Sequence, residues 1–215
     1  MTAVLAVVGL LFLGAAAGAL SARRSAADPG GTSAEAGFAR DMSVHHGQAV
    51  EMAMALHPRT DDPQLRALTR DIALTQQAQI GRMQGWLVEW GLSPTGAEPP
   101  MTWMARAGGE HAAHASFVDG RMPGMATPQD VAALATLPAD DAEVLFLQMT
   151  TAHHLAGVEM AEAGLAVLSE PDARTLAASI AAGQASEVEV LRDMLAARAA
   201  SSEPAEAAGG AHAGH

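Results

Sequence analysis

The chain has 215 residues, of which 49% are hydrophobic and 3% aromatic, and its formal net charge is −12. This length suits one domain with tails, and an acidic chain without a basic stripe is not expected to bind nucleic acid. The absence of cysteine excludes disulfides, thiolate catalysis and cysteine-type zinc sites. Any site for a soft metal must therefore use the 12 methionines and 9 histidines.

The N-terminus carries an uninterrupted apolar run from residue 3 to residue 20, followed by Arg23 and Arg24. The run is long for a signal-peptide core and short for a membrane span, which needs about 20 residues. We interpret residues 1–24 as a signal peptide or membrane anchor, because a buried helix would show a polar face. We therefore expect the protein to be exported, either periplasmic or extracellular or anchored outside the cytoplasmic membrane, with membrane contact only through this segment. Residues 25–35 are expected to form a linker.

An internal repeat organises the rest of the chain. A shift of 108 residues places residues 38–90 on residues 146–198 without a gap, and 15 of the aligned pairs are then identical. Each copy predicts a helical hairpin. Two hairpins predict an all-α, four-helix bundle over residues 36–198, with approximate two-fold internal symmetry.

The expected elements follow in chain order. Pro63 and Pro171 hold matching positions at which a second helix of each hairpin is expected to begin. The repeats cover residues 36–90 and 140–198, and the long connection between them covers residues 91–137. The expected helices span about 36–57, 64–90, 140–168 and 172–199, with a short helix at 128–137 that Thr127 caps. Residues 199–215 are expected to be a disordered tail that contains His212 and His215.

The apolar spacing places one histidine of each repeat on the inner face of its helix. Both repeats carry the motif His-His-x-x-x-Val-Glu-Met-Ala, which starts at His45 and at His153. In the first copy the inward stripe advances in alternating steps of four and three residues, the pattern of a packed helix seam. The stripe consists of Phe38, Met42, His45, Ala49 and Met52, and its counterpart consists of Phe146, Thr150, His153, Gly157 and Met160.

This arrangement of imidazole and thioether groups favours a copper site. His45 and Met52 are seven residues apart, nearly two helical turns, so their side chains lie on one face of the helix. Imidazole binds several transition metals, whereas thioether favours Cu(I) and other soft ions. The alternative is a set of core histidines that hydrogen bonds satisfy. The predicted ligands are Met42, His45, His46, Met52, Met149, His153, His154 and Met160.

Two glutamines and several paired residues complete the candidate set. Gln76 and Gln184 hold matching positions on apolar stripes, and each is expected either to hydrogen-bond a motif imidazole or to tie helices together. The connection between the repeats contains Met101, Met104, His111 and His114, paired at three-residue spacing. Because we expect this segment to have no core to fill, the pairs favour accessory metal capture.

No catalytic signature is present in the sequence. The Glu-x-x-His spacing of di-iron bundles, nucleophile elbows, phosphate-binding loops and His-Glu-x-x-His are all absent. We therefore expect a protein that is not an enzyme, and Glu51 and Glu159 are expected to be ordinary surface residues.

The doubled motif, the Gln76-x-x-Gln79 stretch and Met122-Pro-Gly-Met125 together resemble the family called domain of unknown function 305, over about residues 36–198. The resemblance implies a ferritin-like four-helix bundle and, for some members, an exported copper-binding protein, and it adds Met122 and Met125 to the candidate ligands. Thr150 departs from the pattern, because it stands where Met42 would be matched.

The resulting hypothesis is extracytoplasmic binding, buffering or delivery of Cu(I), with a copper-handling protein as a candidate partner. A helical interaction module without metal is the alternative, and a metal-dependent redox enzyme has less support.

Overall fold

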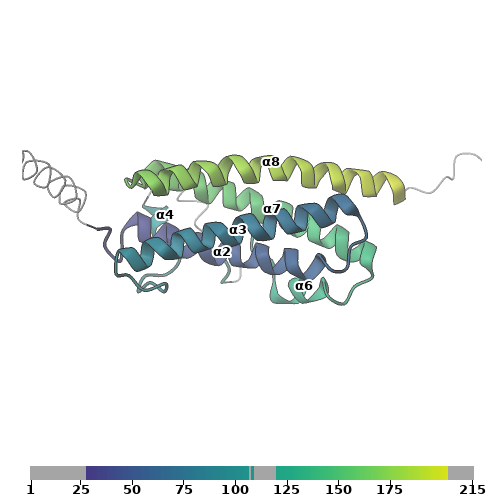
Figure 1. The fold of residues 1–215 in the computed structure, drawn as a ribbon, viewed down its shortest axis with the longest axis horizontal. Coiled ribbons are helices and arrows are strands. Elements are labelled where there is room, and N and C mark those ends of the chain that lie inside the picture. Colours follow the sequence, from purple (N-terminus) through teal and green to yellow (C-terminus); the bar gives the residue numbers. More distant parts are fainter. Residues whose placement is uncertain (1–27, 107, 109–119, 203–215) are drawn as a thin grey trace, which may run out of the picture. The chain divides into compact units, whose positions relative to one another are not determined.

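The computed structural model describes residues 28–106, 108 and 120–202, and this part of the chain is helical without any strand. The apolar N-terminal run, His111, His114 and the C-terminal tail lie outside the described residues. Two hairpins dominate the structure (Figure 1): α2 (Ala34–Leu56) with α3 (Pro63–Glu89), and α7 (Ala139–Val167) with α8 (Pro171–Ser202). The short helices α4 (Thr102–Ala105) and α6 (Pro128–Ala133) lie between them in the chain.

This architecture confirms the all-α bundle of two duplicated hairpins with a long connection. All six helices of the described residues belong to one compact unit that begins at Gly31. The bounds of the long helices lie within one or two residues of the expected ones, except that α8 continues to Ser202. The short helix α6 ends at Ala133 instead of near residue 137, and α4 was not predicted.

Local capping explains where the helices begin. Asp62 accepts hydrogen bonds from the backbone N–H groups of Gln64 and Leu65 at the start of α3, and Pro63 occupies the first helical position. Thr127 accepts from the N–H of Asp130 at 3.0 Å, which confirms the predicted cap of α6.

The two hairpins meet through α2 and α7, while α3 packs along α2 and α8 packs along α7. Ser169, just after α7, donates to Glu35 in the first turn of α2, so α2 and α7 run antiparallel. The core consists of two apolar clusters. The first contains Met42, Met83, Met101, Met104, Met122 and Met160 around Phe38, and the second contains Met52, Leu191 and Met194 around Phe146.

The first part of the connection packs into the core and is not an open loop. Asp41 of α2 accepts hydrogen bonds from the N–H of Met101 at 2.6 Å and from the indole N–H of Trp103 at 2.9 Å. Trp103 meets Phe38 edge to face with ring centroids 5.6 Å apart and covers Gly37, where a Cβ atom would lie 2.5 Å from the indole. Burial raises the pKa of the Asp41 carboxyl, although the hydrogen bonds from Met101 and Trp103 lower it.

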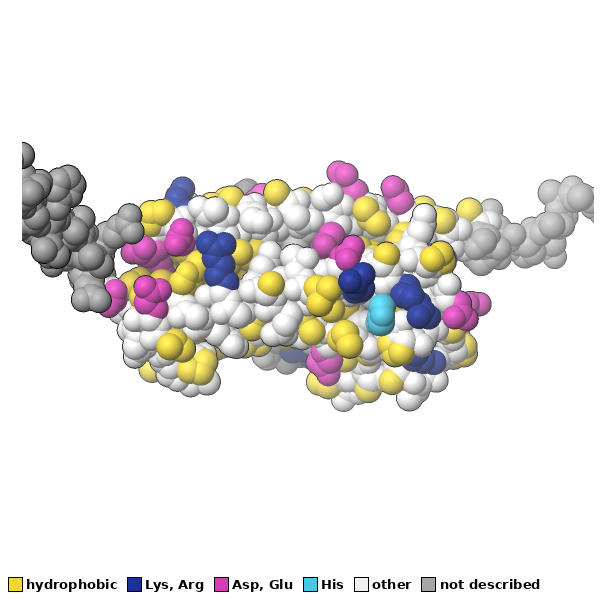
Figure 2. Space-filling model, viewed as in Figure 1, with side chains coloured by type: hydrophobic (Ala, Val, Ile, Leu, Met, Phe, Trp, Pro, Cys, Tyr) yellow, Lys and Arg dark blue, Asp and Glu magenta, His cyan; other side chains and the backbone are white. Residues whose placement is uncertain are grey.

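The surface of the bundle carries scattered charges. The face seen in Figure 2 shows acidic and basic side chains spread among hydrophobic ones. Among the described helices, none is both long and apolar enough to cross a membrane.

Candidate metal centre

Four histidines from the two central helices meet in the middle of the bundle. His45 and His46 of α2 and His153 and His154 of α7 are each 0% exposed. We call these four residues the histidine cluster. The rings of His45 and His153 stack with centroids 3.7 Å apart and planes inclined by 30°. The inward orientation expected from the helix phase is therefore confirmed, and the 108-residue repeat brings equivalent histidines face to face.

Hydrogen bonds fix which nitrogen carries the proton in three of the four rings. His153 Nε2 lies 3.0 Å from the carbonyl oxygen of His45, which can only accept, so Nε2 must be the donor. His46 Nε2 lies 2.7 Å from Gln79 Oε1, and His154 Nε2 lies 2.6 Å from Glu187 Oε2. In the neutral ring, each such bond leaves the Nδ1 atom with a free lone pair.

The lone pairs of the cluster are buried without protein partners. Nδ1 of His46, His153 and His154 makes no hydrogen bond within the described part of the chain. Neither ring nitrogen of His45 makes a hydrogen bond of normal geometry, although the backbone of Pro123 lies close to the ring. Buried polar atoms are normally paired, so the unpaired nitrogens gathered in one cluster mark it as a candidate ligand site.

The same burial keeps the rings of His45, His46 and His153 neutral. Loss of solvation lowers the pKa of His45 to about 3. The neighbouring His46 and His154 also lower this pKa, whereas the backbone of Pro123 raises it. Burial likewise lowers the pKa of His46 to about 4, although the hydrogen bond that His46 donates to Gln79 Oε1 acts in the opposite direction. Burial also lowers the pKa of His153 well below its ordinary value. Neutral imidazole is the form that binds metal ions.

The predicted partners of the imidazoles were the wrong ones. Gln76 and Gln184 are buried, but their amide groups make no hydrogen bond to any described residue. Gln79 and Glu187, one turn further along α3 and α8, hold His46 and His154 instead. The sequence contained a signal for them, because the 108-residue shift also aligns Gln79 with Glu187 and so repeats a polar position.

Small residues bring other groups close to the cluster. A Cβ atom on Gly157 would lie 2.1 Å from Gln184 Oε1, so the side chain of Gln184 fills the space that this glycine leaves. A Cβ atom on Gly124 would lie 2.7 Å from the Ala152 carbonyl and 3.1 Å from the Cα atom of His153. The Met122-Pro-Gly-Met125 turn therefore lies directly on α7 beside the cluster.

The predicted methionine ligands are divided between the two apolar clusters. Met42, Met122 and Met160 lie in the first, and Met52 lies in the second. Met125 and Met149 are half-buried against the first and the second cluster, respectively. Since α2 and α7 are antiparallel, the histidine cluster lies between these two sets of sulfur atoms.

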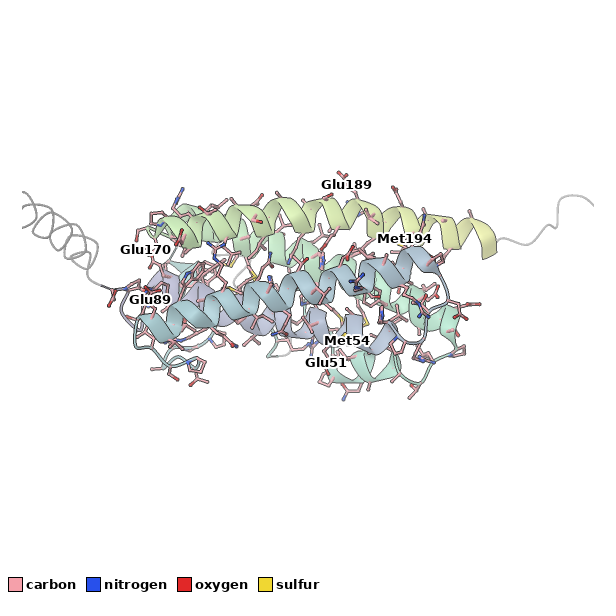
Figure 3. All side chains as sticks on the ribbon, viewed as in Figure 1. Glu51, Met54, Glu89, Glu170, Glu189 and Met194 are labelled. Carbon is pink, nitrogen blue, oxygen red and sulfur yellow. The ribbon has the colours of Figure 1, made fainter. Side chains whose placement is uncertain are left out.

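The accessory methionines do not form the open capture segment that we expected. Met101 and Met104 are 1% and 0% exposed and belong to the first apolar cluster, because the hydrogen bonds that Met101 and Trp103 donate to Asp41 hold this segment against α2. Glu51 is exposed on the outer side of α2 (Figure 3), as expected, whereas Glu159 is half-buried. Within the described residues, no group of three or more His, Cys, Asp or Glu side chains is arranged to hold a metal ion.

Comparison with known proteins identifies the family. The sequence profile of the family described as "Domain of unknown function (DUF305)" matches residues 35–195. The chain therefore belongs to the DUF305 family. No curated protein matches it.

Solved structures of related proteins share the fold. A DUF305 protein from Streptomyces coelicolor, described as a candidate secreted protein, is 44% identical, with a TM-score of 0.69 over 78% of this chain and 94% of that one. A DUF305 fragment from Deinococcus radiodurans is 30% identical, with a TM-score of 0.61 over 77% and 97% of the two chains.

A third similar structure contains copper. CopM in its Cu(II)-bound form is 22% identical, with a TM-score of 0.56 over 77% of this chain and 97% of CopM. CopM has also been solved in Cu(I)-bound and silver-bound forms. At this level of identity, the likeness shows a shared fold.

Proposed function

We propose that this protein binds Cu(I) outside the cytoplasm and buffers or delivers it, without catalysing a reaction. The observation that carries the proposal is the set of five imidazole nitrogens that are buried without hydrogen-bond partners between two methionine-containing clusters. Nitrogen and thioether donors without thiolate suit Cu(I) and its soft relatives.

The geometry of the rings limits how an ion can be held. A ring nitrogen donates through a lone pair in the plane of its ring. Because His45 and His153 are stacked, an ion between their faces would meet neither lone pair, so each ring serves an ion at its own edge. The nitrogen donors would be one ring nitrogen of His45 and the Nδ1 atoms of His46, His153 and His154. The sulfur donors would be Met42, Met52 and Met160.

Two further observations support copper and export. CopM, which shares the fold, has been solved with Cu(I), Cu(II) and silver. The Streptomyces coelicolor relative is described as a candidate secreted protein, in agreement with the apolar run at residues 3–20. A copper-handling protein outside the cytoplasm would be the natural recipient of the ion.

A purely structural role for the histidines is the competing hypothesis. It is favoured by the bonds that tie His46 to α3 and His154 to α8. It leaves unexplained why one nitrogen of each of these rings is buried without a partner, since such atoms each cost about 1–3 kcal/mol.

The deciding experiment measures copper retention. The purified full-length chain is loaded anaerobically with Cu(I) and titrated with a colorimetric Cu(I) chelator. We expect near-stoichiometric copper in the wild type and binding at least about 100-fold weaker in the His45→Ala/His153→Ala variant, because each ring supplies a direct donor. His57→Ala is the matched control, since His57 lies outside the cluster and bonds Thr69. Circular dichroism verifies that all three proteins are helical.

Thermal unfolding gives a second test. A ligand that binds only the native state stabilises it by about 4 kcal/mol at 1,000 times its Kd. Copper should therefore raise the melting temperature of the wild type and of His57→Ala, but not that of the double variant. Equal copper retention by the double variant and the wild type would sink the proposal.

A further inference from the structure

The histidine cluster is closed to solvent, so a ligand reaches it only when part of the structure opens. Its four rings are each 0% exposed. Local openings occur where a segment is held by few bonds that are independent of the rest of the fold. One such segment is residues 98–106, which contains α4 and lies against α2. We call residues 98–106 the strap.

The strap has little stability of its own. Its helix, α4, has only four residues and no side chain caps it, and so short a helix is not stable alone. Met101, at its start, has a φ of +66°, a left-handed conformation that is unfavourable for a residue with a Cβ atom. Contacts with the rest of the protein must therefore hold the strap in place.

The bonds that hold the strap are few. Both hydrogen bonds that join it to α2, from the N–H of Met101 and the indole N–H of Trp103, end on the same oxygen atom, Asp41 Oδ2. At its end, Arg106 donates to the carbonyl oxygen of Thr32 in an exposed position, where water competes for both groups. Loss of the contacts at one carboxylate would thus free the whole strap.

The strap covers the part of the core that leads to the histidines. The indole of Trp103 lies on Gly37, where a Cβ atom would come within 2.5 Å of it. Met104 is 0% exposed and belongs to the same apolar cluster as Met42. Met42 precedes His45 by three residues, about one turn of α2, and is a proposed sulfur donor. Opening of the strap would therefore uncover a sulfur atom beside the histidine cluster.

The other sides of the cluster are held more firmly. On one side lie the long helices α3 and α8, which Gln79 and Glu187 bond to His46 and His154. On α7 lies the turn that contains Gly124, and Gln48 fixes this turn by exchanging two hydrogen bonds with the backbone of Ala126. An opening on these sides would break whole helices or a doubly bonded turn.

We propose that the strap is a lid, which opens as one unit and admits the ligand to the histidine cluster through the first apolar cluster. The exposed residues 93–97 would act as its hinge, because lids move about a few loop positions at their ends. The inference rests on the proposed function for the identity of the ligand. The opening itself is a property of the metal-free protein and is measured without copper.

Hydrogen exchange measured by nuclear magnetic resonance tests the opening. The full-length, metal-free chain is studied at pH 7 in zero to moderate urea. The Met101 N–H and the Trp103 indole N–H should become accessible with the same opening constant, because both are released from Asp41 together. We expect this constant to be at least about 100-fold larger than that of the Ala49 amide in α2, and nearly independent of urea.

Two glycines of α2 provide a matched pair of variants. Gly37→Ala places a methyl group against the indole of Trp103, whereas a Cβ atom on Gly47 would have no atom within 4 Å. Overpacking at residue 37 should raise the opening constant by about tenfold or more, and Gly47→Ala should leave it unchanged. If Gly37→Ala does not fold, Trp103→Phe replaces it, since this change removes the indole N–H and keeps an aromatic ring.

Copper uptake then tests whether the lid controls access. Cu(I) is transferred under nitrogen from a coloured chelator complex, and the loss of colour is followed in time. Gly37→Ala should take up Cu(I) faster by the same factor as its opening constant rises, with an affinity close to that of the wild type, because the closed state still predominates. Gly47→Ala should match the wild type in both rate and affinity.

Failure of the inference can be told apart from failure of the proposed function. The inference is overturned if Met101 and Trp103 exchange only with Ala49 in global unfolding. It is also overturned, with the proposed function left standing, if a variant with a faster-opening strap takes up Cu(I) at the wild-type rate. Wild-type protein that retains no Cu(I) overturns the proposed function and the ligand path, while the exchange rates still decide whether the strap opens.

Discussion

Two polar clusters lie in the same helical bundle, and they differ in how well their atoms are paired. The Glu143 cluster joins both hairpins: Arg198 of α8 donates to Glu143 at 2.6 Å and to Asp62 at 2.8 Å, and Thr60 donates to the other oxygen of Glu143 at 2.6 Å. The histidine cluster, in contrast, leaves five ring nitrogens without partners. The Glu143 cluster pairs its charges within the protein, whereas the histidine cluster leaves nitrogen atoms that the proposed ligand would pair.

The difference suggests separate roles in one fold. A buried pair that is fully bonded costs most when one partner is removed, so the Glu143 cluster should contribute to stability. A cluster with unpaired atoms lowers the stability of the metal-free protein and recovers that energy on binding. The predictions below test this contrast, from the largest expected effect to the smallest.

The largest effect is expected on acid stability of the metal-free protein. Burial lowers the pKa of His45 to about 3 and of His46 to about 4, and it also lowers that of His153. In the unfolded chain these groups take up protons near pH 6.5, and in the native state they do not. The part of the free energy of unfolding that depends on these histidines is therefore fully present above about pH 6.5. It falls as the pH decreases toward 4, by about 1.4 kcal/mol per pH unit for each histidine.

Denaturant unfolding at pH 7, 6, 5 and 4 measures this slope. His153→Phe removes one of the three shifted groups and keeps an aromatic ring beside His45, so its slope should be shallower than that of the wild type. Glu187, in contact with His154, is the carboxylate that faces the cluster from α8, and it is the same in both proteins. Identical slopes in the two proteins would show that the cluster is not kept neutral by burial.

Much of this architecture could be predicted from the sequence. The two hairpins follow from local features, namely the proline at each second-helix start and the apolar stripes. The stripe also oriented His45 and His153 correctly, because a helix turns by a fixed angle for each residue. The repeat placed the two histidines as counterparts, and the structure stacks them.

The partners of the imidazoles could not be predicted in the same way. Gln76 and Gln79 lie one turn apart on the same stripe, and periodicity identifies a face without setting the offset of one helix along another. That offset selects Gln79 for His46 and Glu187 for His154. Burial of Met101 was missed for a related reason, since it depends on Asp41, 60 residues away in the chain.

A moderate effect is expected from breaking the Glu143 cluster. Arg198→Met removes the cation and leaves Glu143, which is only 8% exposed, without its ion pair. Because Arg198 itself is partly exposed, with 20% of its side chain accessible, we expect a loss of about 2–3 kcal/mol, below the range for fully buried pairs. Urea unfolding at pH 7 measures the loss.

Copper binding separates this variant from those of the histidine cluster. Arg198→Met should retain the wild-type affinity for Cu(I), because the Glu143 cluster contributes no proposed donor. Arg192→Met, at an exposed position of the same helix, is the matched control and should change neither property. Loss of copper affinity in Arg198→Met at a temperature where the protein is folded would contradict the separation of roles.

The smallest effect comes from two buried threonines that differ only in pairing. Both are 0% exposed. The hydroxyl of Thr69 donates to the carbonyl oxygen of Arg66 at 3.0 Å and lies 3.0 Å from Nδ1 of His57, whereas that of Thr150 has no partner among the described residues. Replacement by valine should therefore destabilise the protein by about 1 kcal/mol at Thr69 and stabilise the metal-free protein by about as much at Thr150.

The opposite signs make this pair a sensitive test of the comparison. Unfolding in urea at pH 7 with a chelator present measures both variants without metal. If Thr150→Val is as destabilising as Thr69→Val, the Thr150 hydroxyl is satisfied within the protein, and the unpaired atoms near His153 are confined to the histidine cluster. If Thr150→Val is more stable without metal, the unpaired hydroxyl of Thr150 lowers the stability of the metal-free protein, as its lack of a partner predicts.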